Sequence, residues 1–250
     1  GNAYLYGNFV TNSRVDVKYG EAPLATHTFL QKTENAKSYA LDATVISANS
    51  AEEIKSAIEQ KVADGKTTIR LNLAPNAGTN EFNAIREAFE NVKGYSTIDL
   101  TLIGCKEIPA DGLNNQLGGL VALKSITLPD VTKIGKNALL FCVYLEEINT
   151  PNVTSIHENA FGGCTNLQKI TFGELTEVKG LSHDYDGILD PGVDTERINL
   201  VLSENQKVMT KNRQGNEYFW TPTKEYYKGS VEYGIPSFLE YKFKSVSLKK

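Results

Sequence analysis

A 22-residue repeat in the middle of the chain constrains its fold more than any other feature. Residues 123–144 read LKSITLPDVTKIGKNALLFCVY and residues 145–166 read LEEINTPNVTSIHENAFGGCTN, so that 9 of 22 positions are identical without a gap. A third copy begins at residue 167 as LQKITFGELTEV and then diverges. The apolar positions recur in register at Leu123, Leu145 and Leu167, at Ile126, Ile148 and Ile170, at Val131, Val153 and Leu175, and at Ile134, Ile156 and Val178. Such a period predicts a stack of similar coils, each of which buries its apolar side against its neighbours.

Two looser copies lie upstream of this segment. One unit spans 26 residues from Thr97, and the other spans 29 residues from Thr68. Their template positions are Thr97, Leu100, Leu102, Cys105 and Ile108 in the first unit, and Thr68, Leu71, Leu73, Asn76 and Thr79 in the second. Asn or Cys at the ninth position belongs to the leucine-rich repeat signature L-x-x-L-x-L-x-x-N/C-x-L. We therefore predict a leucine-rich repeat solenoid over residues 68–202, an α/β fold of short parallel strands joined by turns and short helices.

Each repeat is predicted to contain a short strand followed by turns. Ile126-x-Leu128 alternates as a strand with one buried face does. Pro129 then ends the strand pairing, because proline has no N–H to donate. The segments 137–139 (Asn-Ala-Leu) and 159–161 (Asn-Ala-Phe) are predicted to begin a helical turn in each coil.

The repeats resemble a known family. The phrases ITLPDVTKIGKNAL and INTPNVTSIHENAFGGCTNLQKITF are similar to the BspA-type leucine-rich repeats of bacterial surface proteins, whose pattern is near L-x-x-I-x-I-P-x-x-V-T-x-I-G-x-x-A-F-x-x-C-x-x. The close match covers residues 123–178, a looser one reaches back to residue 68, and His157 stands where the pattern has Gly. The resemblance implies an exported protein of the bacterial cell surface, often lipid-anchored, with a role in adhesion or host contact and no catalysis. The chain begins at Gly1 rather than Met, so we expect any export signal to have been removed already. The lipid anchor that the resemblance implies for many such proteins would lie upstream of Gly1.

Both ends of a solenoid expose its core, so covering segments are expected there. We assign residues 1–67 to an N-terminal cap made of short strands and a helix near 50–64. The helix prediction rests on Ser50-x-x-Glu53, which fits a capping box, and on Gly65, which ends the helix. We assign residues 203–250, which are rich in aromatic side chains, to a C-terminal cap.

Charge and motifs exclude several classes of function. The net charge is −4, so we expect no nucleic-acid partner, which would favour a clustered basic face. The apolar runs are far shorter than the roughly 20 residues that cross a bilayer. The sequence has no G-x-S-x-G motif, no phosphate-binding loop and no dinucleotide fingerprint, so we predict no enzyme activity and no cofactor.

The three cysteines are predicted to be reduced and buried. Cys142 and Cys164 fall at the same position of successive repeats, so their side chains point the same way. Their Cβ atoms would be about one coil apart, farther than the roughly 3.8 Å that a disulfide prefers. Cys105 occupies the ninth position of its own unit.

No metal site is predicted. His27, His157 and His183 are scattered and show no metal-ligand spacing. The loop 179–196 is acidic but does not fit the calcium-loop pattern D-x-[DN]-x-[DN]-G-x₅-E. We interpret it as a solvated loop, with a calcium site as the alternative.

Strand residues that point away from the core form the predicted binding face. They fall at the third and fifth positions of the repeat and are Arg70, Asp99, Ser125, Glu147 and Lys169, and Asn72, Thr101, Thr127, Asn149 and Thr171. Solenoids often bind through this extended surface. The alternative is a solvated polar face with paired charges such as Glu147 and Lys169.

A second candidate surface lies in the aromatic tail. Tyr218, Phe219 and Trp220 are adjacent and would stack on sugar rings. The alternative is that they seal the end of the core.

We therefore expect a monomeric, non-catalytic surface protein that binds a protein or glycan partner on another cell or in the matrix. One alternative is a structural component of a surface assembly. The other is a carbohydrate-binding accessory protein that uses the aromatic C-terminal segment.

Overall fold

The structure is a computed structural model that describes residues 45–116, 120–179, 187–206, 237–239 and 241–249, and the backbone of six further short strands. The chain divides into two units, Gly1–Val45 and Ile46–Lys250. The first unit contains two antiparallel strand pairs, β1 (Tyr4–Tyr6) with β4 (Ser38–Ala40) and β2 (Arg14–Tyr19) with β3 (Ala22–Thr28). The boundary between the units falls inside the segment 1–67 that the sequence assigned to one cap.

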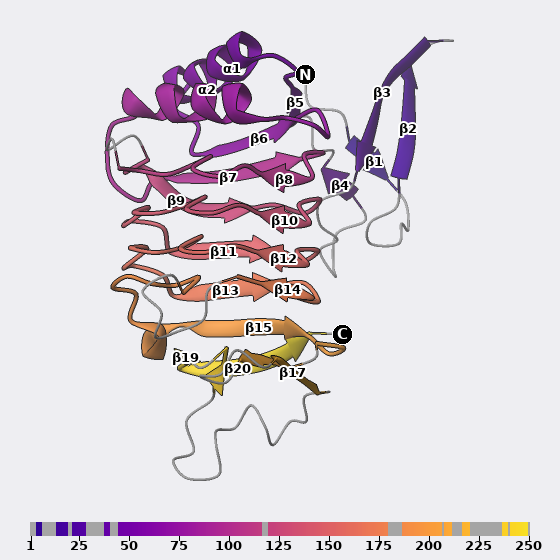
Figure 1. The fold of residues 1–250 in the computed structure, drawn as a ribbon. Coiled ribbons are helices and arrows are strands. Elements are labelled where there is room, and N and C mark those ends of the chain that lie inside the picture. Colours follow the sequence, from indigo (N-terminus) through magenta and orange to yellow (C-terminus); the bar gives the residue numbers. More distant parts are fainter. Residues whose placement is uncertain are drawn as a thin grey trace. The chain divides into compact units, whose positions relative to one another are not determined.

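The second unit is a stack of coils whose strands form two parallel sheets (Figure 1). The larger sheet has eight strands, and its strand pairs from β6 to β20 are parallel. These strands are β5 (Val45–Ser47), β6 (Thr68–Asn72), β7 (Ile98–Ile103), β9 (Leu123–Thr127), β11 (Glu147–Thr150), β13 (Lys169–Phe172), β15 (Asn199–Ser203) and β20 (Ser245–Lys249). Ile126, Ile148 and Ile170 pair directly across β9, β11 and β13, which confirms the predicted stacking of the repeats.

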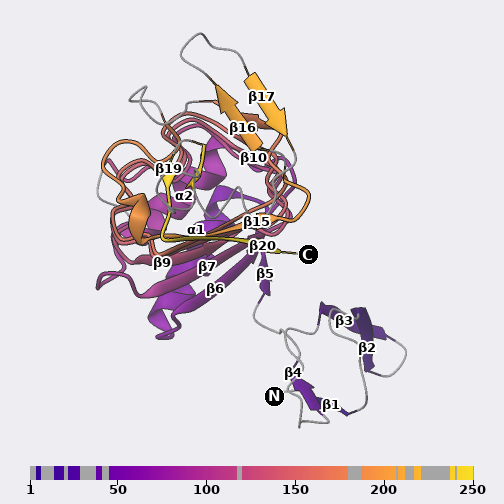
Figure 2. The same ribbon diagram turned by 90° about the horizontal axis from the view of Figure 1, so that it is seen from below.

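The smaller sheet lies on another side of the coils (Figure 2). Its four parallel strands are β8 (Glu107–Ile108), β10 (Lys133–Ile134), β12 (Ser155–Ile156) and β14 (Glu177–Val178). The predicted fold, a leucine-rich repeat solenoid, is therefore correct. Among the described residues, this unit also contains the 3₁₀ helix η1 (Thr195–Arg197) and two antiparallel pairs, β16 (Val208–Lys211) with β17 (Glu217–Trp220) and β18 (Ser237–Phe238) with β19 (Tyr241–Lys242).

Two helices, α1 (Ala51–Ala63) and α2 (Thr79–Glu90), pack against each other at the β6 end of the stack (Figure 1). The predicted helix α1 is confirmed: Ser50 Oγ accepts a hydrogen bond from Glu53 N at 3.2 Å, and Gly65 follows the end of the helix with φ +69°. Helix α2 was not predicted. Its Phe82, Ile85 and Phe89 are buried at helical spacing, yet the repeat template had been extended through Thr79.

The register of β6 also differs from the prediction. The sequence alignment placed Leu71 opposite Leu100, whereas in the structure Ile69 pairs with Leu100 and Leu71 pairs with Leu102. A shift of two residues leaves every side chain on its original face, because strand side chains alternate with a period of two. The apolar pattern alone therefore cannot distinguish the two registers.

The predicted helical turns in the coils are wrong. Asn137 and Asn159 have left-handed backbones, with φ +55° and +53°, and the chain continues in successive turns such as Leu140 N to Asn137 O at 3.1 Å. Each turn also bonds to the next coil, as Asn137 N does to Glu158 O at 2.9 Å. A ladder of turns thus replaces helices on this side of the stack.

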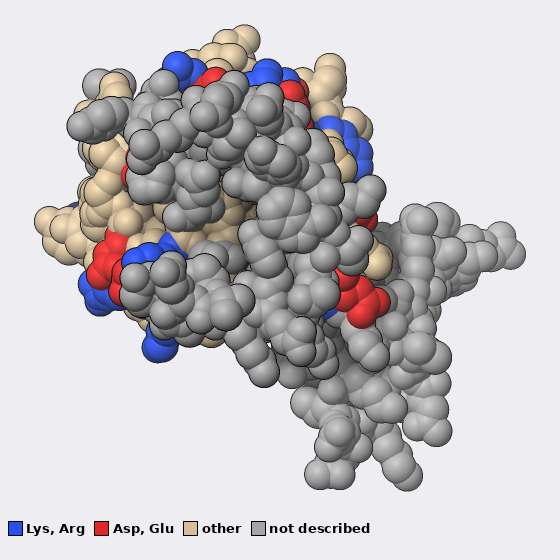
Figure 3. All heavy atoms as spheres, turned by 60° about the horizontal axis from the view of Figure 1, so that its bottom comes forward, with Lys and Arg blue, Asp and Glu red and all other residues tan. Residues whose placement is uncertain are grey.

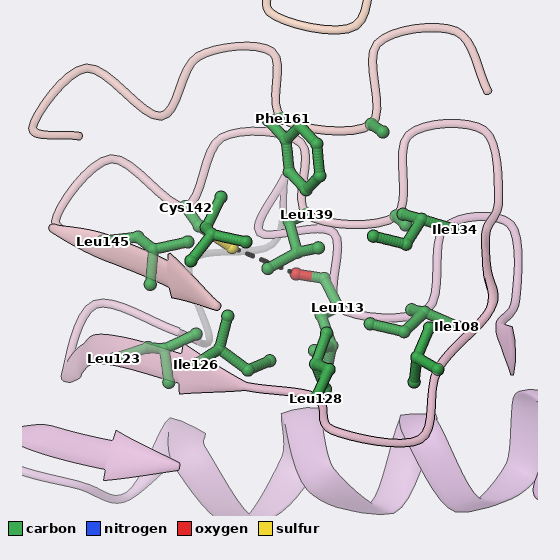
Figure 4. Packing of buried hydrophobic residues seen from close by; sticks show 14 of the residues in the cluster. Ile108, Leu113, Leu123, Ile126, Leu128, Ile134, Leu139, Cys142, Leu145 and Phe161 are labelled. Carbon is green, nitrogen blue, oxygen red and sulfur yellow. Dashed lines mark hydrogen bonds between the residues drawn. The ribbon is translucent and has the colours of Figure 1, made fainter. Parts of the chain in front are cut away.

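The core fills the interior of the coils (Figure 4). Leu123 and Ile126 of the larger sheet lie on one side, Ile108 and Ile134 of the smaller sheet lie on the other, and Leu139 lies between them. The three cysteines are free and buried, as predicted. Two of their thiols donate to backbone carbonyls, Cys142 Sγ to Leu113 O at 3.3 Å and Cys164 Sγ to Leu139 O at 3.2 Å.

Candidate binding face

The outward side chains of the larger sheet form two rows across the coils. The first row comprises Thr68, Asp99, Ser125, Glu147, Lys169, Asn199 and Ser245, and the second comprises Arg70, Thr101, Thr127, Asn149, Thr171, Val201 and Ser247. The shifted register of β6 places Arg70 beside Thr101 and Asn72 beside Ile103, rather than beside Asp99 and Thr101 as the sequence alignment had them.

Neighbouring side chains of the first row are hydrogen-bonded to one another. Ser125 Oγ donates to Asp99 Oδ1 at 2.6 Å, and Lys169 Nζ donates to Glu147 Oε1 at 2.7 Å. The Lys169 and Glu147 side chains are 47% and 40% exposed, so their ion pair contributes at most about 1 kcal/mol to stability. These groups remain accessible to a partner.

The second row is less accessible than predicted. Thr171 is only 6% exposed, so its side chain offers no surface for a partner. Thr101, Thr127 and Asn149 are half-buried. Asp99, Ser125 and Glu147 of the first row are half-buried as well, so the central parts of the two rows differ mainly at Lys169, which is exposed, and Thr171, which is buried.

A hollow of about 380 Å³ lies on the first row and extends to the N-terminal ends of the strands. Its lining comes from five successive strands, β7 to β15, and from the residues that precede β11 and β13. It consists of Asp99, Lys124, Ser125, Glu146, Glu147, Gln168, Lys169 and Asn199. The sequence analysis did not select Lys124, Glu146 and Gln168. They stand at the second position of three repeats and are all polar, which is the signal that could have identified them.

A pair of tyrosines, one of them largely exposed, stands beside this hollow. Tyr95 is 65% exposed, and its ring packs against that of the half-buried Tyr144 at 4.8 Å between centroids, with the two ring planes tilted by 37°. The next residue, Ser96, donates through Oγ to Glu146 Oε1 at 2.6 Å, and Glu146 lines the hollow. Neither tyrosine is among the predicted binding residues, because Tyr95 precedes the repeat unit that begins at Thr97 and Tyr144 occupies the last, variable position of its repeat.

The smaller sheet also carries a row of paired polar groups. Lys133 Nζ lies 2.8 Å from Glu107 Oε1, and Ser155 Oγ donates to Glu177 Oε2 at 2.6 Å. The hydrogen bond from Ser155, with the nearby Lys179 and His157, lowers the pKa of Glu177. On the left of the face that Figure 3 shows, acidic and basic atoms of described residues lie next to each other. This row of paired charges therefore does not favour either a strongly acidic or a strongly basic partner.

Several predicted sites fall outside the described residues. The side chains of Tyr218, Phe219 and Trp220 are among them, although the β17 backbone pairs with β16. Residues 180–186 of the acidic loop also lie outside the described residues. In the described part of that loop, Asp190 accepts a hydrogen bond from Tyr241 Oη at 2.9 Å. Within the part of the chain that the structure describes, no three His, Cys, Asp or Glu residues are grouped as metal ligands would be. Among those same residues, no helix is long and apolar enough to cross a membrane.

Comparison with protein families identifies the repeats. The BspA type leucine rich repeat region, in six copies, matches residues 86–182. No curated protein and no solved structure matches the chain.

Proposed function

Residues 86–182 are a BspA-type leucine-rich repeat region, and from this premise we propose that the chain is a non-catalytic binding module of the bacterial cell surface. Leucine-rich repeats generally mediate protein interactions, and the BspA type is typically surface-associated and non-catalytic. The proposed partner is a protein or glycan on another cell or in the matrix. Export, adhesion and an upstream lipid anchor are parts of this proposal.

The observation that carries the proposal is the hollow on the first row of the larger sheet. Five successive coils contribute polar side chains to it, so a partner would contact several repeats at once. The backbone of each strand is fully engaged with its neighbours, and the inward side chains are buried. The accessible side chains of the first row can therefore serve recognition without loss of core stability.

A matched pair of charge reversals tests this proposal. Glu147 in the hollow and Glu107 on the smaller sheet are 40% and 45% exposed, and each pairs with a lysine at 2.7 and 2.8 Å. The full chain would be applied to an array of extracellular-matrix proteins and oligosaccharides, and the tightest ligand titrated against Glu147→Lys and Glu107→Lys. We expect Glu147→Lys alone to weaken binding, by roughly tenfold or more.

If Glu107→Lys abolishes binding and Glu147→Lys leaves it unchanged, the binding site lies on the smaller sheet and not on the larger one. Melting temperatures of both variants serve as the control. Both side chains are exposed, so neither change should lower stability by more than about 1 kcal/mol.

A further inference from the structure

The loop that places Tyr95 against Tyr144 has an unusual backbone conformation. Ser96 has φ +53°, a left-handed conformation that residues other than glycine seldom adopt. Ser96 N donates to Val121 O at 3.0 Å, which holds the loop along the start of β9. From there Tyr95 contacts Tyr144, at the end of the repeat that contains β9, and Ser96 contacts Glu146, at the start of the next repeat.

The exposure of Tyr95 is not explained by folding. A ring that is 65% exposed buries little apolar surface, yet a strained loop holds it against Tyr144. Large exposed aromatic rings fixed in place are typical of binding surfaces, since they give contact area with little loss of side-chain freedom. The exposed ring of Tyr95, packed against Tyr144, therefore offers a platform next to the hollow.

The chemistry of the hollow favours a neutral ligand rich in hydroxyl groups. Its lining holds three carboxylates, two ammonium groups, two amides and a hydroxyl, which are Asp99, Glu146 and Glu147, Lys124 and Lys169, Gln168 and Asn199, and Ser125. Ligand hydroxyls both donate and accept, so they can bond with every one of these groups. A strongly acidic or basic peptide would instead meet like charges in the same small space.

The size of the hollow agrees with this ligand class. Its volume of about 380 Å³ lies within the range of small-ligand sites, about 300–1,000 Å³. It is an open surface feature, which suits an elongated chain that passes over it. The C–H faces of sugar rings are apolar and would pack on the tyrosine platform while their hydroxyls reach the hollow.

We infer that the hollow and the Tyr95–Tyr144 pair form a subsite for a neutral oligosaccharide, with one sugar ring on Tyr95 and its neighbour over Glu146 and Lys124. This inference rests on the proposed binding role of the same face. It assigns the stacking function to Tyr95 and Tyr144.

An array of neutral oligosaccharides of graded length, probed with the full chain, tests the inference. The tightest oligosaccharide would then be titrated by calorimetry against Tyr95→Ala, Tyr95→Phe and Glu146→Gln. We expect Tyr95→Ala to weaken binding by roughly tenfold or more, and Tyr95→Phe, which keeps the ring, to change it by less than about threefold. Glu146→Gln should weaken binding, whereas Glu107→Gln on the smaller sheet should leave it unchanged.

The same experiment separates the two proposals. The subsite is overturned if no neutral oligosaccharide binds, or if Tyr95→Ala binds as tightly as the unchanged chain. If a matrix protein binds and Glu147→Lys weakens it while no oligosaccharide binds, the proposed function stands and the subsite does not. If neither array gives a ligand, both proposals fall. Because Tyr95 is largely exposed, Tyr95→Ala should keep its melting temperature, which is the control for folding.

Discussion

Asp111, Asn137 and Asn159 occupy equivalent turns of three coils and share a left-handed backbone, with φ of +57°, +55° and +53°. Asn and Asp tolerate this conformation better than other residues with side chains. The recurrence of Asn137 and Asn159 is visible in the sequence, where it predicts the start of a helical turn, whereas Asp111 lies in the looser upstream unit and is not part of that prediction. Residue type alone does not separate a helix start from a left-handed turn, since Asn and Asp are common at both.

Replacement of Asn137 tests this interpretation. Asn137→Val should lower the free energy of unfolding by about 1–2 kcal/mol, because a branched side chain is strained at positive φ. Asn137→Gly should change it by much less, although it loses the 3.1 Å hydrogen bond from Asn137 Nδ2 to Asp111 Oδ1. Urea denaturation of both variants measures the difference, and equal destabilisation would show that the backbone of residue 137 is not left-handed.

The buried thiols give a prediction about pH. Burial, with the nearby Asp130, raises the pKa of Cys105 to about 11, and the neighbouring thiol of Cys164, together with burial, raises the pKa of Cys142 well above its usual value. At pH 8 these groups should remain neutral thiols and react slowly with a thiol reagent in the folded chain. After unfolding, three groups per chain should react. A count of one would show that two cysteines are bridged.

At the level of secondary structure, the repeat spacing predicts some elements correctly and misses others. Repeat spacing predicted β9, β11 and β13 in the correct register, because three copies share one period. It failed for β6, where a two-residue shift preserves the same inward face. It also missed α2, whose buried Phe82, Ile85 and Phe89 follow helical rather than repeat spacing.

The inward face of β11 can be tested by two neighbouring changes to aspartate. Ile148 is fully buried between Ile126 and Ile170, so Ile148→Asp places an unpaired charge in the core and should unfold the chain. Asn149→Asp, one residue along, points outward and should change the melting temperature little. An unchanged melting temperature for Ile148→Asp would show that the face is assigned wrongly.

The stack as a whole depends on both ends being covered. Helices α1 and α2 pack at the β6 end. At the other end, β20 extends the sheet beyond β15, and the tail side chains of Phe238, Leu239 and Phe243 are 2–3% exposed. Sequence composition predicted that the tail serves as a cap, and these buried side chains are consistent with that assignment. Its detailed packing could not be predicted, because it follows no repeat.

This division of roles predicts that stability and binding respond to different substitutions. Phe243 is buried and its ring contacts that of Tyr241 at 6.4 Å between centroids, so Phe243→Ala should cost about 3–5 kcal/mol of stability and lower the melting temperature markedly. Below that temperature the folded variant should bind its ligand as tightly as the unchanged chain, since the hollow is lined by residues of β7 to β15 and their entry turns. Glu147→Lys should show the opposite pattern, with weaker binding and an unchanged melting temperature.

Measuring the binding affinity and the melting temperature for both variants, and for Trp220→Ala, locates the site. If Trp220→Ala abolishes binding while the melting temperature is unchanged, the ligand stacks on the aromatic tail and the sheet face is not the binding surface.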